Sequence, residues 1–102
     1  MKITTTDRNN VVVVAVEGEI QFGTALEFRT AMNDVIATTS ATRVELDLGN
    51  VTYLDSSGLG VLLTSRDLAR KRDKELVLVG CRGGVRDVLA VARFDRLFTI
   101  NS

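Results

Sequence analysis

Two adjacent serines follow an aspartate where an apolar run ends, in the segment VTYLDSSGLGVLL at residues 51–63. Ser56 and Ser57 supply hydroxyl groups, and Asp55 supplies a carboxylate beside them. Gly58 and Gly60 come next, and glycine lets another group approach the backbone closely. Four interpretations fit this pattern: a catalytic elbow, a phosphate-binding loop, a plain helix cap, or a docking point whose serine is itself a substrate.

The two enzymatic interpretations fail on missing residues. A nucleophile elbow reads G-x-S-x-G, and here Leu54 stands where the first glycine belongs. The chain has no histidine, which removes His-based hydrolysis and His-ligated zinc. Lys71 and Lys74 lie roughly 20 Å along the following helix from Ser57. A P-loop needs a lysine after its last glycine, and none follows Gly60. We therefore expect no enzyme, no cofactor and no metal.

The plain helix cap remains open. Asp and Ser are preferred at helix N-termini because their oxygens accept free backbone N–H groups, so either Asp55 or Ser56 could be the N-cap. A cap alone does not account for Gly58 and Gly60, since glycine inside a helix costs about 1 kcal/mol relative to alanine. The two glycines favour an exposed surface that a partner can approach closely.

Strands and helices alternate along the rest of the chain. Alternation and β-branched runs predict strands at residues 2–7, 11–20, 43–49 and 75–80, and residues 97–100 as an edge strand or a packed tail. Helical periodicity predicts helices at residues 24–37, 57–72 and 83–94, the first opened by a capping box of Thr24 and Glu27. The expected inward faces of these helices are Ala25, Phe28, Met32, Val35 and Ile36; Val61, Leu62, Ser65, Leu68 and Ala69; and Val85, Val88, Leu89 and Ala92. The pattern predicts an α/β fold with a mixed sheet.

Length and composition limit the class of protein. With 102 residues the chain forms one domain, residues 1–102. Thirteen basic and thirteen acidic residues give zero formal net charge, which argues against nucleic-acid binding. No apolar stretch approaches the roughly 20 residues of a membrane span, and no signal peptide is visible. Cys81 is the only cysteine and is interpreted as a packed small hydrophobe. A cytoplasmic protein without a membrane partner is expected.

Nearly the whole chain resembles the STAS domains, in particular the free-standing bacterial anti-sigma factor antagonists. The resemblance is carried by VEGEIQFGTALEFRTAM, by VELDLGNVTYLDSSGLGVLLTSRDLARKR and by GGVRDVLAVARFDRLFTI. It implies a compact mixed-sheet fold and a regulatory protein. In that family the unphosphorylated form binds an anti-sigma factor that is also a serine kinase, and thereby releases the sigma factor. The kinase phosphorylates the second serine of the block, here Ser57, and a metal-dependent phosphatase reverses the modification.

The resemblance and the residue pattern together give a predicted partner-binding surface. One departure lies in the first motif, where the family commonly has Gly-Glu-Leu-Asp and this chain has Gln21 in the last position. Gln21 keeps hydrogen-bonding capacity but carries no charge. The alternative function is a non-switching STAS interaction module in a larger signalling assembly. The expected partner-binding residues are Gln21, Phe22, Asp55, Ser56, Ser57, Gly58, Gly60 and Thr64.

Overall fold

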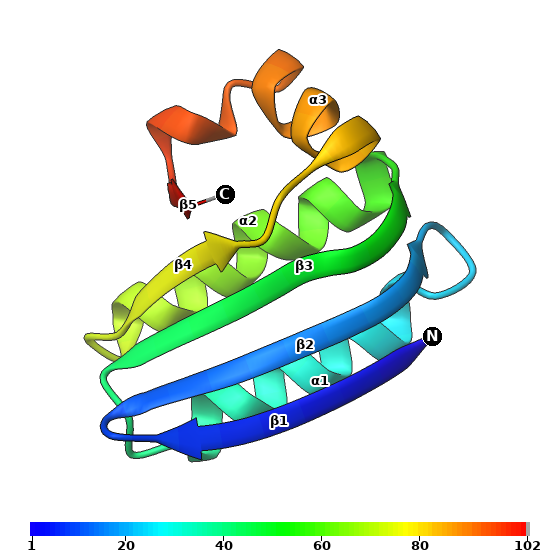
Figure 1. The fold of residues 1–102 in the computed structure, drawn as a ribbon. Coiled ribbons are helices and arrows are strands. Elements are labelled where there is room, and N and C mark those ends of the chain that lie inside the picture. Colours follow the sequence, from blue (N-terminus) through cyan, green and yellow to red (C-terminus); the bar gives the residue numbers. More distant parts are fainter. Residues whose placement is uncertain (102) are drawn as a thin grey trace.

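A computed structural model describes residues 1–101, which form a five-stranded sheet with helices packed on it (Figure 1). The elements in chain order are β1 (Lys2–Arg8), β2 (Val11–Ile20), α1 (Ala25–Thr38), β3 (Arg43–Leu54), α2 (Ser56–Lys71), β4 (Glu75–Val79), α3 (Gly83–Val91), a 3₁₀ turn η1 (Phe94–Arg96) and β5 (Thr99–Asn101). The predicted alternation of strands and helices is confirmed. Of residues 97–100, predicted as an edge strand or a packed tail, Thr99 and Ile100 belong to the short edge strand β5, and Leu97 and Phe98 precede it.

The sheet is mixed because only its first connection is a hairpin. β1 runs antiparallel to β2, and the β2–β3, β3–β4 and β4–β5 pairs are parallel, in the spatial order β1-β2-β3-β4-β5. The hairpin turns at Asn9 and Asn10, whose φ angles are 47° and 66°. Asparagine tolerates this left-handed region better than most residues, which explains why the DRNN segment makes a tight turn.

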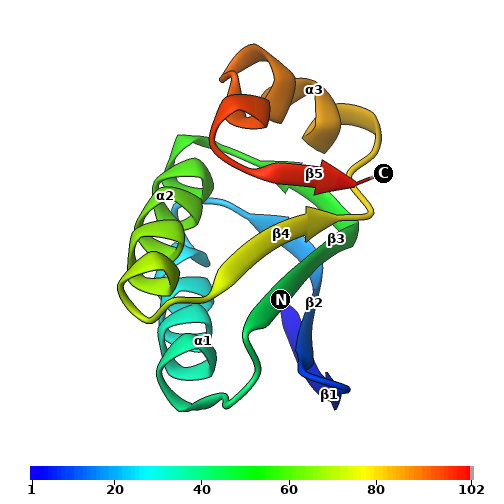
Figure 2. The same cartoon turned by 90° about the vertical axis from the view of Figure 1, so that its left-hand side faces the viewer.

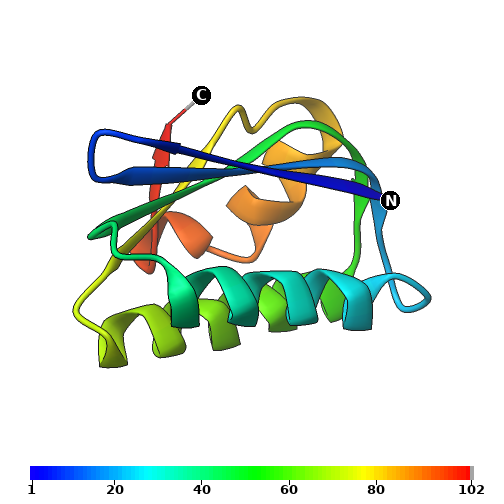
Figure 3. The ribbon, with the colours of Figure 1, turned by 90° about the horizontal axis from the view of Figure 1, so that it is seen from below.

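α1 and α2 lie side by side on one face of the sheet (Figure 3). Their inward residues match the sequence-based prediction: Phe28, Met32 and Ile36 of α1 are buried. Alternate residues of β2 and β3 meet them from the sheet. Figure 2 shows α3 above β5, apart from α1. In α3 the predicted inner residues Val85 and Leu89 are buried. No helix in residues 1–101 is long and apolar enough to cross a membrane.

β3 is longer than the sequence pattern predicts. The prediction ended the strand at Gly49, but the strand continues to Leu54. β2 is long as well, and its end pairs with the additional part of β3, up to Ile20 against Leu54. The register shifts between Ala15 and Glu17 and again between Gly18 and Glu19. These irregularities break the strict alternation of apolar residues along β3, so the alternation in the sequence ends at Gly49 although the strand continues.

The predicted capping box at α1 is wrong. Thr24 is the N-cap residue, but its side chain makes no capping hydrogen bond. The hydroxyl instead donates to the backbone oxygen of Glu19 (2.8 Å) and accepts from the backbone N–H of Gln21 (3.1 Å). The side chain therefore fastens the preceding loop, and Glu27 is exposed in the first turn. The hydroxyl is therefore used by the end of β2 and the loop that follows it, and not by the free amides of α1.

Cys81 is 2% exposed and packs with the core, as predicted. Burial raises the pKa of its thiol above the ordinary value of 9.0, and the negative charge of Asp47 raises the pKa further. Since the thiolate forms more easily in the unfolded chain, the neutral thiol contributes stability that is complete below the unfolded pKa. That contribution is lost as pH rises towards the folded pKa.

We therefore expect the free energy of unfolding to fall above about pH 9, by up to about 1.4 kcal/mol per pH unit from this group. Urea unfolding of wild type and Cys81→Ala between pH 8 and pH 10.5 measures the effect. The variant controls for the lysines and the tyrosine that titrate in the same range. Equal alkaline slopes for the two proteins would contradict the assignment.

Candidate functional site

The candidate site is built where β2 and β3 end together. Ile20 and Leu54 are paired in the parallel register, so the chain leaves the sheet at neighbouring points to start α1 and α2. In Figure 1 the β2–α1 loop and the β3–α2 turn lie at the same end of the molecule. In an open α/β sheet, the carboxyl ends of parallel strands are the usual position for binding residues. The sheet therefore brings the GEIQFG loop and the DSSGLG turn together, although 33 residues separate Phe22 from Asp55.

Asp55 is the N-cap of α2 and also ties the two loops together. Its Oδ1 accepts the backbone N–H groups of Ser57 (2.9 Å) and Gly58 (3.2 Å). Its Oδ2 accepts the backbone N–H of Phe22 from the other loop (3.2 Å). The sequence did not decide whether Asp55 or Ser56 is the N-cap of α2, and the geometry assigns this role to Asp55. The carboxylate thus fixes Ser57 and Phe22 relative to each other.

The two serines differ in position. Ser56 is exposed at the start of α2, whereas Ser57 is half-buried and lines a groove between α1 and α2. Neither hydroxyl makes a hydrogen bond with another group in residues 1–101, so neither is the structural cap. Ser57 therefore presents a free hydroxyl at the edge of the groove, where a docked protein can reach it.

The two glycines have separate roles. Gly58 is buried, and a Cβ there would lie 2.8 Å from Cγ2 of Ile20 and overlap the side chain of Leu54. Gly58 is a packing residue that lets α2 start close against the sheet, and it does not form part of the exposed surface. Gly60 is exposed, and a Cβ there would meet nothing within 4 Å. Only the second glycine leaves the bare surface that the sequence suggested.

The groove between α1 and α2 has a volume of about 450 Å³. It combines exposed apolar side chains with the free hydroxyl: Phe22 is 84% exposed and Leu26 is 71% exposed. Large apolar side chains exposed next to each other mark interaction sites on soluble proteins. Phe22 is therefore a surface residue of the β2–α1 loop and not part of the core. The lining residues are Phe22, Ala25, Leu26, Arg29, Ser57, Gly60, Val61 and Thr64.

Sequence reasoning placed Phe22, Ser57, Gly60 and Thr64 at the site, and the structure brings these four together on the groove. It missed Leu26 and Arg29. Leu26 offered a signal that was available in the sequence. It is a large apolar residue one position away from the inward stripe of α1, where a purely structural helix carries polar residues.

Gln21 is not among the residues that line the groove. Its side-chain Oε1 accepts the backbone N–H of Gly23, and its backbone oxygen accepts that of Thr24 (3.0 Å). The residue is half-buried and closes the β2–α1 loop on itself. An acidic side chain at position 21 would add a negative charge to the β2–α1 loop. The neutral side-chain amide of Gln21 instead stabilises this loop, which carries Phe22, through the bond to Gly23.

The sequence comparisons agree with this architecture. Residues 2–102 match the model of the STAS domain. A STAS-domain containing protein of Pseudomonas aeruginosa is 40% identical over 88 residues, which cover 86% of this chain and 85% of the relative. The anti-sigma-B factor antagonist of Listeria monocytogenes is 37% identical over 67 residues, covering 66% of this chain and 58% of that protein. The chain belongs to the STAS domain family.

The fold is shared with solved members of the family. The crystal structure of an anti-sigma factor antagonist from Mycobacterium paratuberculosis superposes with a TM-score of 0.88 at 29% identity, covering 98% of this chain and 84% of that one. The mixed sheet and the helices therefore confirm the fold that the sequence resemblance implied.

Proposed function

We propose that this protein is an anti-sigma factor antagonist, and that the groove between α1 and α2 is its docking surface. The observation that carries the proposal is the free Ser57 hydroxyl on the same groove as exposed Phe22 and Leu26. An apolar groove with an accessible hydroxyl suits a partner that both binds and modifies the surface. The names of the Listeria and Mycobacterium relatives support an anti-sigma factor as that partner.

In this proposal the unphosphorylated protein binds an anti-sigma factor that is also a serine kinase, which releases the sigma factor. Transfer of the γ-phosphoryl group of ATP to the Ser57 oxygen then ends the interaction, and a metal-dependent serine phosphatase restores the hydroxyl. The protein is a regulatory binding partner and a substrate, acting in the cytoplasm. Asp55, Ser56, Gly60 and Thr64 complete the contact surface around Ser57.

The physical basis of the switch is desolvation. A phosphoserine carries about −1.5 to −2 charges at neutral pH. On a solvent-exposed rim such a charge is tolerated, but inside a docked interface an unpaired charge costs several kcal/mol. Every 1.4 kcal/mol is a tenfold change in affinity. Phosphorylation therefore releases the partner without a change of fold.

The alternative is a STAS module that binds through the same groove and is not phosphorylated. Gln21 favours this reading, because its amide leaves the β2–α1 loop without the acidic side chain that the family commonly has there. Both functions use the groove, and they differ only in the chemistry at Ser57.

The experiment that separates the two functions first captures the partner from native cells. The recombinant protein is then incubated with the captured partner and ATP, and its intact mass is measured together with that of the protein captured from cells. One phosphoryl group, about 80 mass units, should be gained. Peptide mapping should place it on Ser57, and Ser57→Ala should gain none while still binding. Ser56→Ala is the matched control and should still be phosphorylated. A phosphate mapped to Ser56 would leave the passive module as the function. The same conclusion would follow if the captured partner were a kinase with ATP bound and this protein still gained no phosphate.

A further inference from the structure

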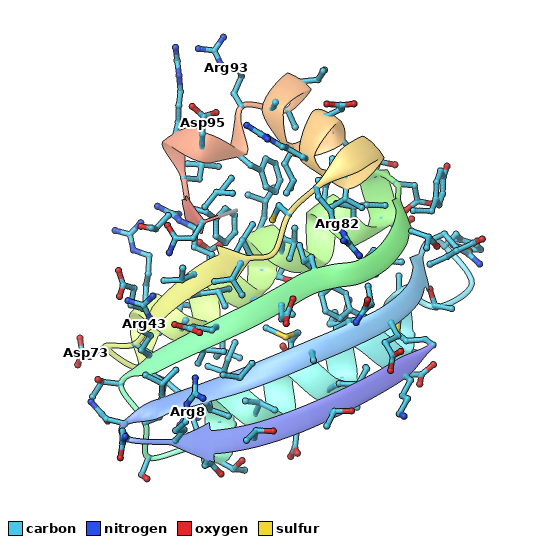
Figure 4. All side chains as sticks on the ribbon, in the orientation of Figure 1. Arg8, Arg43, Asp73, Arg82, Arg93 and Asp95 are labelled. Carbon is cyan, nitrogen blue, oxygen red and sulfur yellow. The ribbon has the colours of Figure 1, made fainter. Side chains whose placement is uncertain are left out.

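Arg29 lies on the same groove as Ser57, on the opposing helix. It is exposed, and it makes none of the ion pairs or side-chain hydrogen bonds found in residues 1–101. It is also the one cationic residue among those that line the groove. Figure 4 shows Arg8 and Arg43 at the opposite end of the sheet from the β2–α1 loop, and the guanidinium of Arg82 already donates to the backbone oxygen of Gly49 (2.9 Å). A negative charge placed on Ser57 therefore meets one candidate counter-ion across the groove.

The N-terminus of α2 is a poor alternative counter-charge. Helix N-termini bind anions through free backbone N–H groups, but the N–H groups of Ser57 and Gly58 already donate to Asp55. The same carboxylate also places a negative charge next to any phosphate on Ser57. A phosphate would have to displace Asp55, and with it the contact to Phe22, in order to reach these amides. The opposing helix is the more accessible side.

The groove leaves a path between the two groups. Side chains on a helix lean towards its N-terminus, so the Arg29 side chain can reach back over the preceding turn of α1, the turn that carries Ala25 and Leu26. α1 and α2 begin at the same end of the helix pair (Figure 3), and Ser57 is in the first turn of α2. Gly60 adds no side chain on the α2 side, and a Cβ there would meet nothing within 4 Å. The long arginine side chain can therefore cross the groove.

We propose that the phosphate on Ser57 pairs with Arg29 across the groove. The pair closes the groove over Leu26 and removes the arginine from the surface offered to the partner. The phosphate carries about −1.5 to −2 charges and Arg29 only one positive charge, so phosphorylation leaves a net negative charge on the docking surface and also withdraws its cation. This inference rests on the proposed modification of Ser57. Guanidinium and phosphate suit each other geometrically, since two parallel N–H groups can bind two oxygens.

The test uses protein with phosphoserine encoded at position 57 and follows the titration of the phosphate by ³¹P NMR. Pairing with Arg29 stabilises the dianion. An exposed ion pair of about 0.3–1 kcal/mol corresponds to a change of about 0.2–0.7 in the second pKa of the phosphate. Arg29→Gln should therefore raise that pKa by about this amount, and the difference should shrink between about 0.05 M and 1 M salt.

Two controls make the result specific. Arg86→Gln removes the same charge from an exposed arginine in a separate hollow beside Cys81, and it should leave the titration within a few hundredths of wild type. Phosphoserine encoded at exposed position 56 should respond little to Arg29→Gln. Equal shifts from the two arginine variants would overturn the pairing. Because no kinase or partner is present, this outcome is independent of whether Ser57 is phosphorylated in cells.

Discussion

A Ser57→Asp variant is expected to fold like wild type and to bind the anti-sigma partner at least about tenfold more weakly. Ser57 lines the groove, so in the proposed complex the docked partner removes its side chain from water. One unpaired interfacial charge costs more than the 1.4 kcal/mol that corresponds to tenfold in affinity. The carboxylate carries one charge and the phosphate nearly two, so phosphorylated protein should bind more weakly still. Isothermal titration with the purified partner measures both.

Ser57→Asn is the matched control, since it has almost the shape of aspartate without the charge. It should lose less affinity than Ser57→Asp. Ser56→Asp places the same charge one residue earlier, on an exposed side chain of the contact surface that does not line the groove, and should lose less affinity than Ser57→Asp. Binding by Ser57→Asp at the wild-type affinity would refute the electrostatic switch, and equal losses for Asp and Asn would indicate a steric effect instead.

Gly58→Ala is expected to lower the free energy of unfolding by about 1–3 kcal/mol, the usual cost of overpacking a core. The added methyl group would overlap Leu54 and lie 2.8 Å from Cγ2 of Ile20. It would also lie 3.3 Å from the backbone oxygen of Ile20, which cannot turn aside as a side chain can. The start of α2 must then shift away from the sheet. Urea or thermal unfolding gives the magnitude.

Gly60→Ala is the internal comparison two residues later. A Cβ there meets open space, and alanine is the better helix former by about 1 kcal/mol, so this variant should be as stable as wild type or more stable. The two glycines look alike in the sequence, and only the packing distinguishes them. Equal melting temperatures for Gly58→Ala and Gly60→Ala would contradict the close approach of α2 to the sheet at Gly58.

The sequence predicted the order of the elements well, because each carried a strong local signal. The β-branched run of β2 and the helical spacing in α2 depend on nearby residues alone. The same locality explains why the position of the DSSG turn at a helix start could be predicted. The extension of β3 could not, since it depends on how far β2 continues beside it and on two register shifts between the strands.

The details of the site depend on contacts between distant segments. Thr24 followed by Glu27 is a good local capping signal, yet the hydroxyl is used by Glu19 and Gln21 of the preceding loop. Arg29 carried no sequence signal as a site residue, because an arginine on an exposed helix position is ordinary. Its relation to Ser57 exists only after the sheet has placed α1 beside α2.

The hydrogen bond from Phe22 to Asp55 has a consequence for how such a surface can evolve. The donor is a main-chain amide, which every amino acid except proline supplies. Side chains in the GEIQFG loop can therefore change while the loop stays in register with the serine-bearing turn. Specificity for one partner over another can drift through these exposed positions at little cost to the scaffold. Proline at position 22, or loss of the carboxylate at position 55, would remove this hydrogen bond and leave the loop and the turn joined through the bond from the Asp55 amide to the backbone oxygen of Ile20 (3.2 Å).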